Sequence, residues 1–407
     1  MDGERVFSEP FDVRLRLMVC SDVHLRGPAD ERRGRLITAL ETAIRVAEKD
    51  ANHPALDGAV FVGDLTDHGT KDEYVCFFDT VKETLGGRIP VFSVLAKNHD
   101  NWEHGRASVK TGLRYYREIT GKATDFHETV GGFHLIGLST SDNDGEYYAD
   151  AQKAWLETAL AEASADAPGR PVFVFTHEHI PDTVFGSAAL DGWAHSFFSG
   201  VFDEYSHAVC FSGHSHYPLN DPRSIWRGAY TAAGTGAMSY AELSADGVRK
   251  LHPPGSDEIS QGWILEADGE NRVRLTGCDF LSGDVLCRYL IDPAAPLPLH
   301  APSGVPAFPQ GAAITAEKMD GKLRLSFPAA KIADSTPVTA YRVILSAENE
   351  DLRERLVIPP YWRSRVPETL SCTFENVPDK GRIAAYAQNA YGAAGGPLTY
   401  EWTPDQP

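Results

Sequence analysis

The chain has 407 residues, 42% of them hydrophobic and 23% charged, which is typical of a globular protein with two or three domains. Lys and Arg number 38 against 57 Asp and Glu, and the resulting net charge of −19 argues against extended nucleic acid as a partner, because like charges repel. No apolar run approaches the ~18 residues that a membrane span needs, so we expect no membrane partner.

Residues 13–291 alternate short β-branched runs with amphipathic stretches, the pattern of layered α/β structure. The periodicity predicts, in chain order, a strand at 15–20, a helix at 31–50, a strand at 58–62, a helix opened by a capping box of Thr70 and Glu73, a strand at 89–95, a hairpin at Gly131-Gly132, a helix at 150–162, strands at 171–175 and 208–211, and a hairpin at 263–280. We therefore expect one α/β domain over residues 1–295.

Proline is so frequent between residues 292 and 310 that neither a helix nor a central strand can persist there. We interpret residues 296–310 as a linker that joins the first domain to a second domain of residues 311–407. The second domain has short alternating segments at 322–327, 340–345 and 382–387, which predict a small β-sandwich.

The cysteines and the first residues indicate a cellular compartment. The six cysteines form no C-x-x-C pair, so we expect free buried thiols, and a disulfide between Cys278 and Cys287 across a hairpin is the alternative. Residues 1–9 are acidic and lack the basic and apolar regions of a secretory signal. We expect a cytoplasmic protein, although an exported form stays open if the sequence has lost a leader.

Five of the predicted strands end in polar clusters. The clusters are Ser21-Asp22-Val23-His24, Gly63-Asp64-Leu65-Thr66-Asp67, Lys97-Asn98-His99-Asp100, Thr176-His177-Glu178-His179 and Gly213-His214-Ser215-His216. Parallel or mixed sheets form their ligand sites at the carboxyl ends of strands, so the five clusters can converge on one pocket. Asp22 and His24 alternate along an extended segment, which places both side chains on one side as ligands for one metal.

Each cluster alone has a simpler interpretation, such as a solvated strand end, a turn, or a hydrogen-bonded core histidine. Together these interpretations are poor, because polar groups at the ends of buried strands cost free energy unless they are paired or bound to metal. Five clusters that offer nitrogen and oxygen but no sulfur donors favour two divalent metals that share a bridging carboxylate. A serine-histidine-aspartate arrangement or a P-loop, which would indicate other chemistry, is not found.

The order D-x-H, G-D-x-x-D, N-H-D, H, G-H-x-H from Asp22 to His216 resembles the calcineurin-like metallophosphoesterase superfamily, and flanking strands extend the match to about Asp292. Residues 63–69, followed by Glu73 and Tyr74, are similar to the branch of class III cyclic-nucleotide phosphodiesterases and glycerophosphodiesterases. Purple acid phosphatases differ, because they carry a tyrosine ligand where this chain has Asp67. The resemblance implies a four-layer α-β-β-α sandwich.

The resemblance also implies a ligand set for two divalent ions, Mn, Fe or Zn. One metal is assigned to Asp22, His24, Asp64 and His216, and the second to Asp64, Asn98, His177 and His214. His99 matches the histidine that approaches the leaving group, and Asp100 matches the acid that orients this histidine. The residues implied to bind substrate are Lys97, Asn98 and His99.

Two such cations acidify a bridging water to hydroxide, align a phosphate oxygen and neutralise charge during in-line attack, while His99 protonates the departing alkoxide. We expect hydrolysis of small phosphodiesters such as cyclic nucleotides or glycerophosphodiesters. A phosphomonoesterase is the alternative of the same class. The alternative of another class is a binding protein that keeps the metals for structure and acts through its C-terminal domain.

Three features leave alternatives open. Lys97 replaces the usual glycine of the family, so either the turn is rebuilt or the lysine has a strained backbone with its ammonium near the phosphate. His179 is an alternative to His177 as a ligand, and we favour His177 because it is closer to the end of the buried strand. Five aromatic side chains between the motifs belong either to the core or to the rim of the site: Tyr147, Tyr148, Trp193, His195 and Phe197.

The C-terminal segment resembles a fibronectin type III domain, an immunoglobulin-like all-β sandwich. Residues 387–392 are similar to the A-x-N-x-x-G signature of that fold. Gly381 stands where the corner tyrosine is expected, and Phe327 stands where a core tryptophan is frequent. We expect a packing or binding module, whose partner the sequence does not identify.

Overall fold

The computed structural model describes residues 11–101, 109–141, 146–245, 248–294, 304–319, 321–334, 336–348 and 351–403. Residues 1–9, on which the leader prediction rests, lie outside the described residues, as do residues 296–303 of the predicted linker. The predicted domain limits therefore stay a prediction.

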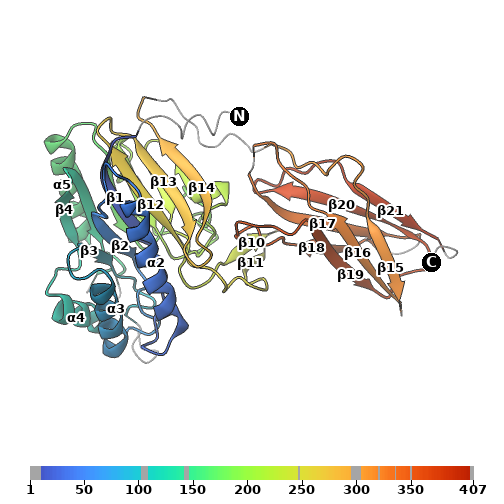
Figure 1. The fold of residues 1–407 in the computed structure, drawn as a ribbon, viewed down its shortest axis with the longest axis horizontal. Coiled ribbons are helices and arrows are strands. Elements are labelled where there is room, and N and C mark those ends of the chain that lie inside the picture. The colour runs from blue at the N-terminus through green and yellow to red at the C-terminus, as the bar shows by residue number, and fades with distance from the viewer. Residues whose placement is uncertain are drawn as a thin grey trace. The chain divides into compact units, whose positions relative to one another are not determined.

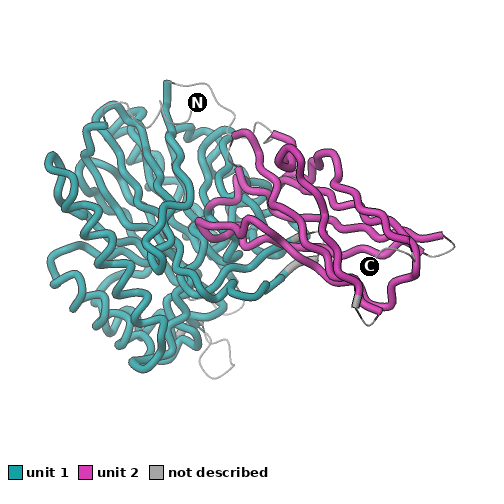
Figure 2. Tube along the Cα trace, turned by 45° about the vertical axis from the view of Figure 1, so that its right-hand side comes forward, with its two compact units in different colours: residues 1–219, 223–244, 249–299 teal, residues 220–222, 245–248, 300–407 magenta. Residues whose placement is uncertain are grey.

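The described chain divides into two compact units (Figure 2). Unit 1 comprises residues 1–219, 223–244 and 249–299, and unit 2 comprises residues 220–222, 245–248 and 300–407. The two units are described separately below.

Unit 1 contains two six-stranded sheets (Figure 1). The first has the order β14-β13-β12-β1-β2-β3, and its strands are β1 (Val13–Cys20), β2 (Gly58–Val62), β3 (Val91–Val94), β12 (Gln261–Asp268), β13 (Val273–Asp279) and β14 (Asp284–Ile291). The second has the order β4-β5-β6-β7-β9-β8, and its strands are β4 (Phe126–Val130), β5 (Phe133–Leu138), β6 (Val172–Thr176), β7 (Ala208–Ser212), β8 (Ile225–Arg227) and β9 (Thr231–Gly234). A separate hairpin follows in β10 (Leu243–Ala245) and β11 (Val248–Leu251).

The two sheets of unit 1 pack face to face, and helices cover their outer faces. The helices are α2 (Glu31–Glu48), α3 (Lys71–Thr84), α4 (Val109–Thr120) and α5 (Asp150–Asp166). Along β1, Leu17 and Val19 enter the core between the sheets together with Phe175 of β6, whereas Met18 enters the core beneath α2 and α3. Because both faces of β1 are buried, its sequence is a continuous apolar run rather than an alternating one. The helix α5 covers the other sheet through Leu156 and its neighbours.

The direction of the strands determines where the polar clusters lie. β1, β2 and β3 are parallel to one another, and β5, β6, β7 and β9 are parallel in the second sheet. The carboxyl ends of the parallel strands therefore meet at one edge of each sheet. The capping box that opens α3 is present as predicted, with reciprocal bonds between Thr70 and Glu73.

All six cysteines are free, and four of them are buried. In the ladder of β13 and β14, Cys278 pairs with Val285 and Cys287 pairs with Gly277, so the two thiols do not stand opposite each other. The alternative of a disulfide across this hairpin is therefore wrong.

Unit 2 is an all-β unit of two sheets. One sheet has the order β15-β16-β19 and the other β18-β17-β20-β21, with strands β15 (Thr315–Met319), β16 (Lys322–Pro328), β17 (Val338–Ser346), β18 (Arg353–Val357), β19 (Thr369–Glu375), β20 (Gly381–Asn389) and β21 (Leu398–Trp402). Phe327 and Tyr341 are buried in the core between the sheets. A Cβ atom at Gly381 would lie 2.3 Å from the ring of Trp402, which explains why no tyrosine fits at this position.

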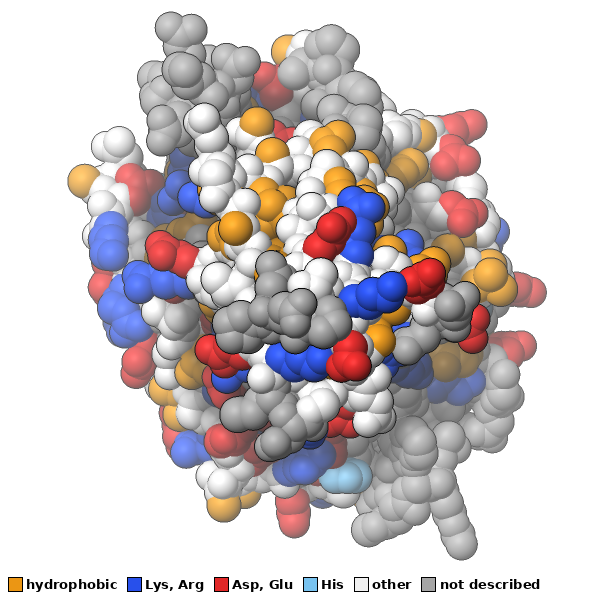
Figure 3. Space-filling view, turned by 90° about the vertical axis from the view of Figure 1, so that its right-hand side faces the viewer, with side chains coloured by type: hydrophobic (Ala, Val, Ile, Leu, Met, Phe, Trp, Pro, Cys, Tyr) orange, Lys and Arg blue, Asp and Glu red, His pale blue; other side chains and the backbone are white. Residues whose placement is uncertain are grey.

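The surface carries charges of both signs. Figure 3 shows one face, where Lys and Arg alternate with Asp and Glu and hydrophobic side chains lie between them. The acidic excess of the sequence thus forms no continuous negative field on that face. Within the described ranges, no helix combines the length and the apolar character that a membrane crossing requires.

Candidate metal centre

The predicted ligands come together at the carboxyl ends of the strands. Asp22 and His24 follow β1, Asp64 follows β2, and Asn98 follows β3. The second sheet supplies the other members of the cluster, which are His177 after β6 and His214 and His216 after β7. Five of the seven side chains are at most 5% exposed: Asp22, His24, Asp64, His177 and His216. The cluster is therefore polar and largely buried.

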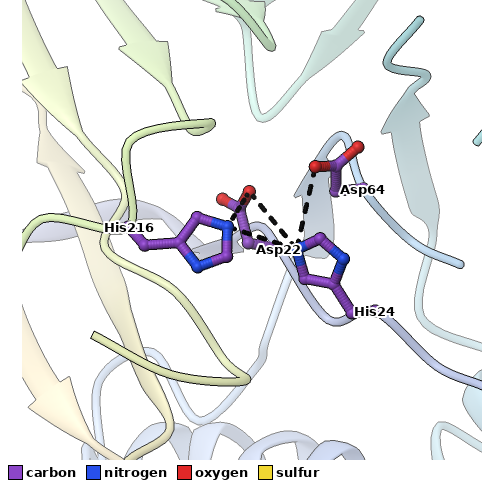
Figure 4. A group of neighbouring side chains, drawn as sticks. All are labelled: Asp22, His24, Asp64 and His216. Atoms are coloured by element: carbon purple, nitrogen blue, oxygen red, sulfur yellow. Dashed lines mark hydrogen bonds and ion pairs between the residues drawn. The ribbon is translucent and has the colours of Figure 1, made fainter. Parts of the chain in front are cut away.

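The first group of candidate ligands comprises Asp22, His24, Asp64 and His216 (Figure 4). Nε2 of His216 lies 3.0 Å from Oδ1 of Asp22, and Nε2 of His24 lies 3.2 Å from Nε2 of His216. Nε2 of His24 is also 3.7 Å from Oδ2 of Asp64. One ligand atom from each of the four residues lies within 4.8 Å of the others, which is the spacing of donors around one cation.

The second group comprises Asp64, His177 and His214, with Asn98 beside them. Nε2 of His177 lies 3.3 Å from Oδ2 of Asp64 and 3.1 Å from Nδ1 of His214. The amide nitrogen of Asn98 is 3.3 Å from Oδ2 of Asp64 and 3.4 Å from Nδ1 of His214. Asp64 belongs to both groups, as the prediction of a bridging carboxylate requires.

The backbone is strained where it presents these ligands. The structure describes nine residues other than glycine with positive φ, and five of them are candidate ligands, namely Asp22, His24, Asp64, His214 and His216, with φ between 50° and 73°. Such a conformation costs about 1–2 kcal/mol for each residue with a Cβ atom. Hydrogen bonds between the loops offset part of this cost, since Asp22 N donates to Gly63 O and His24 N donates to Asp64 O, both at 3.0 Å. Strain of this kind concentrates at functional sites.

Two glycines let the loops approach the cluster closely. A Cβ atom at Gly63 would lie 2.2 Å from Nδ1 of His177, and Gly63 has a φ of 84°. A Cβ atom at Gly213 would lie 2.7 Å from Oδ2 of Asp22. Any side chain at either position would displace a candidate ligand, so only glycine fits at these two positions without a steric clash.

The Nδ1 atoms of three histidines make contacts that orient the imidazole rings toward the cluster. Nδ1 of His177 donates to the carbonyl of Val62 at 2.9 Å, and Nδ1 of His216 donates to the carbonyl of Tyr240 at 3.2 Å. Because these bonds fix the proton on Nδ1, the Nε2 lone pair of each ring faces the cluster. Nδ1 of His24 lies 3.5 Å from the carboxylate of Asp67, which orients this ring in the same way.

The donor set fits divalent cations. Among the residues that the structure describes, Oδ1 of Asp64 and Oδ1 of Asn98 have no hydrogen-bond partner, although buried polar atoms are normally paired. Burial by itself raises the pKa of Asp22, but the charge and the hydrogen bond of His216 outweigh it and hold the pKa at about 2. Burial likewise opposes ionisation of Asp64, but the charge of His177 holds the pKa of this carboxyl well below its usual range. Two ionised carboxylates with imidazole and amide donors suit borderline divalent metals.

His99 lies beside the first group. Its ring stands edge-on to the ring of His24, with 4.3 Å between the centroids, and its Nδ1 donates to the carbonyl of Asp67 at 2.8 Å. Its side chain is 31% exposed, so a substrate can reach it.

Asp100 is fully buried beneath the two loops. Its carboxylate accepts hydrogen bonds from the backbone and hydroxyl of Thr66, both at 3.1 Å, and from Ala96 N at 3.0 Å. Burial and the charge of Asp64 raise its pKa to about 7. Asp100 thus joins the loops that carry Asp64 and His99, and the predicted orientation of His99 by this acid stays a prediction.

Lys97 occupies an unstrained turn. It is not among the residues with positive φ, so the alternative of a strained lysine is wrong and the turn is rebuilt. Its ammonium lies 4.3 Å from the centroid of the Tyr147 ring, a cation–π contact at the rim of the site.

His179 and the aromatic side chains between the motifs also have clear positions. Both ring nitrogens of His179 contact serine hydroxyls, Ser212 at 2.7 Å and Ser215 at 2.9 Å, and His177 joins the cluster instead. Among the aromatic side chains, Trp193 lies 4.9 Å from the ring of His214, whereas Tyr148 and Phe197 pack with the core beneath α5. Tyr147 and His195 contact each other at 5.1 Å.

Two residues of the site are not identified by sequence reasoning. Asp67 belongs to a motif, but its contact with His24 depends on the folded loop. Tyr240 lies outside every motif, yet its ring is 4.2 Å from the ring of His216. No signal in the sequence identifies Tyr240.

A mixed α/β fold with a buried carboxylate and histidine cluster at its strand ends defines a class of metal-dependent hydrolases. Residues 15–218 match the calcineurin-like phosphoesterases, and the chain belongs to this family of enzymes that hydrolyse phosphoesters.

Two proteins that are similar in sequence carry phosphodiesterase names. A probable cyclic nucleotide phosphodiesterase of Rhodopseudomonas palustris is 28% identical over 285 residues, which cover 66% of this chain and 93% of that protein. A probable glycerophosphodiester phosphodiesterase, GpdQ, of Arcobacter nitrofigilis is 29% identical over 140 residues, 34% of this chain and 46% of that protein. Among solved structures, a purple acid phosphatase from yellow lupin has a TM-score of 0.48 and 13% identity, and the match covers 68% of this chain and 53% of that chain.

Proposed function

We propose that this protein hydrolyses small phosphodiesters at a centre of two divalent cations, Mn, Fe or Zn, that share Asp64. The observation that carries the proposal is the membership of Asp64 in both ligand groups. The contacts of the same carboxylate support the proposal further, because its Oδ2 lies 3.7 Å from Nε2 of His24 in the first group and 3.3 Å from Nε2 of His177 in the second. Imidazole donors and carboxylate donors in one site favour these metals over Mg or Ca.

The residues of the chain have separate tasks in this proposal. Two bound cations would supply Lewis-acid activation of the phosphate and of a water and would neutralise charge in the transition state. Asp22, His24 and His216 hold one cation, and Asn98, His177 and His214 hold the other. His99 protonates the departing alkoxide, because it is partly exposed and its ring adjoins that of His24.

Charge supports a small substrate. A chain with a net charge of −19 repels long polyanions, whereas a buried pair of cations attracts a single phosphate that is small enough to enter. The two named relatives, a cyclic nucleotide phosphodiesterase and a glycerophosphodiester phosphodiesterase, support a diester. Lys97 is the observation that favours the second candidate, a phosphomonoesterase, because an additional cation at the rim attracts a dianion.

Kinetics with a common leaving group test the proposal. The wild-type protein, loaded with Mn²⁺, is given bis(p-nitrophenyl) phosphate and p-nitrophenyl phosphate side by side. We expect the higher kcat/KM on the diester. A tenfold preference for the monoester, about 1.4 kcal/mol in the barrier, contradicts the diesterase and favours the second candidate. Bound metal without turnover of either compound favours the binding protein.

We also propose that unit 2 is a fibronectin type III domain and that the protein is cytoplasmic. The strand orders β15-β16-β19 and β18-β17-β20-β21 support the first proposal, because that sandwich is built from a three-stranded and a four-stranded sheet. Six free thiols support the second, since oxidising compartments favour disulfides.

A further inference from the structure

A loop that contains no predicted motif is attached to one of the candidate ligands. The carbonyl of Tyr240 accepts the hydrogen bond from Nδ1 of His216, and Glu242 N donates to the carbonyl of His216 at 3.0 Å. The loop therefore keeps a fixed position relative to the metal centre. It also places the ring of Tyr240 at 4.2 Å from the His216 ring and at 6.0 Å from the His24 ring.

Tyr240 contacts the candidate ligand His216 and also lines a cavity. The cavity has a volume of about 470 Å³, and its lining includes Glu31, Arg32, Ser239, Tyr240, His252 and Pro253. This volume is within the usual range of small-molecule sites. Tyr240 and His252 form an aromatic wall, with 5.2 Å between the ring centroids. An organic group in the cavity would thus lie next to a phosphate held at the centre.

The polar groups of the cavity indicate what it can bind. Ser239 is only 2% exposed, and its hydroxyl oxygen is buried without a hydrogen-bond partner among the residues described. Because this hydroxyl has no exposed surface, it offers no hydrogen bond to a group in the cavity. Arg32 is already engaged, since its guanidinium donates to the carbonyl of His24 at 2.9 Å. The charged residues of the lining are two carboxylates, Glu31 and Asp257, and the engaged Arg32, so the cavity is poorly suited to a second phosphate.

We propose that this cavity is the subsite for the ester group of the diester that does not leave, and that it takes an uncharged planar aromatic group such as a nucleobase or a nitrophenyl ring. The group stacks on the ring of Tyr240, which lines the cavity. A monoester has no second ester group to place there, so the subsite gives a physical reason for a preference for diesters. The inference rests on the proposed function.

Two diesters with one leaving group test the subsite. Bis(p-nitrophenyl) phosphate carries an aromatic spectator group and methyl p-nitrophenyl phosphate carries a methyl group, while both are monoanions that release p-nitrophenolate. We expect Tyr240→Ala to lower the ratio of kcat/KM on the aromatic diester to kcat/KM on the methyl diester about fivefold or more, because stacking on the spectator group is lost only with the aromatic diester. Tyr240→Phe keeps the ring and is expected to retain the wild-type ratio of the two values.

The metal content of each variant is measured with the kinetics. If Tyr240→Ala holds its full metal content and loses kcat/KM equally on both diesters, the subsite is contradicted, whereas the proposed function is not. Metal-loaded wild-type protein that hydrolyses neither diester overturns the proposed function and the subsite together. If Tyr240→Ala fails to fold, His252→Ala tests the same wall, since the His252 side chain is 49% exposed. An unchanged ratio in that variant then contradicts the aromatic wall.

Discussion

The two ends of β1 carry two buried clusters of charged residues that differ in one respect. Near the start of the strand, the guanidinium of Arg16 lies 2.6 Å from Asp50 and 2.8 Å from Glu266, and Glu266 also contacts Arg274 at 2.6 Å. This cluster contains two cations and two anions, and each has a partner of opposite charge. Just after the end of the strand, Asp22 lies in the candidate metal centre, where oxygens of Asp64 and Asn98 have no hydrogen-bond partner within the described part of the chain.

The difference distinguishes a structural cluster from a binding site. Charges that are buried permanently must be compensated by the chain itself, because an unpaired buried charge costs several kcal/mol. The cluster at Arg16 meets this condition, whereas the cluster at Asp64 leaves oxygens for ions that are not part of the chain. Substitutions at the two ends of β1 should therefore fail in different ways, which the following predictions use.

Removal of the shared carboxylate should have the largest effect. Asp64→Ala is expected to lose both metals and to reduce diester turnover at least about 10⁴-fold, since both cations act in the transition state. Metal analysis of the purified variant, together with turnover of bis(p-nitrophenyl) phosphate, measures this. Two tightly bound metals in the variant would contradict a bridging role of Asp64.

Removal of the Arg16 guanidinium, near the start of β1, should lower the free energy of unfolding instead. Arg16→Met leaves Glu266 with Arg274 as its remaining cationic partner and removes the Arg16 contact of Asp50, which is 27% exposed, so the stability of unit 1 is expected to fall by about 3 kcal/mol, the lower end for a broken buried pair. Thermal denaturation measures this effect. The folded variant should still bind two metals.

An exposed ion pair provides the matched control for Arg16. Arg382 lies 3.7 Å from Glu401, and its side chain is 57% exposed. Arg382→Met should cost at most about 1 kcal/mol, because exposed ion pairs contribute little. Equal losses for the two variants would remove the distinction between buried and exposed pairs.

Removal of His99, the proposed general acid, should slow the reaction without changing the metal content. His99→Ala is expected to keep both metals and to slow diesters with alkoxide leaving groups about 10²-fold, since general acid catalysis matters most for a poor leaving group. p-Nitrophenolate needs no proton, so its release should change little. A comparison of the two leaving groups tests the role, and equal losses would assign His99 to binding.

Among the substitutions at the candidate metal centre, the change of the contact that orients His24 should give the smallest effect. Asp67 lies 3.5 Å from Nδ1 of His24 and 2.8 Å from Arg26. Asp67→Asn is expected to weaken binding of one metal by about 10- to 100-fold, the usual effect of a partner behind a ligand. Titration with Mn²⁺ should show one weakened site and one unchanged site, and two unchanged sites would contradict the role.

The sequence predicted elements well where the signal is local. The strand at 58–62 has its predicted limits, and the box of Thr70 and Glu73 opens a helix as expected. The sequence analysis did not predict the helix α4 or the strands β8 and β9. The two strands were missed because they have only three and four residues and their pairing depends on distant segments. The order of strands within each sheet is likewise a property of long-range pairing that periodicity does not contain.

The cluster of candidate ligands was predicted because each of its residues follows a strand in a short motif. The residues around it were predicted less well, since their contacts depend on loops. The turn at Lys97 adopts an ordinary backbone that the usual glycine did not suggest. Asp100 contacts Thr66 and Ala96 across two loops, and Tyr240 reaches His216 from a segment without any motif. Sequence patterns identify polar groups that meet at strand ends, but not the packing that surrounds them.

One titration tests the central claim most directly. Metal-free protein is titrated with Mn²⁺ while bound metal and turnover of bis(p-nitrophenyl) phosphate are measured on the same samples. The shared carboxylate of Asp64 predicts two bound ions per chain, with diester turnover that rises as the second ion binds. Full turnover with a single bound ion, or two bound ions without turnover of the diester, would contradict a diesterase with two cations on Asp64.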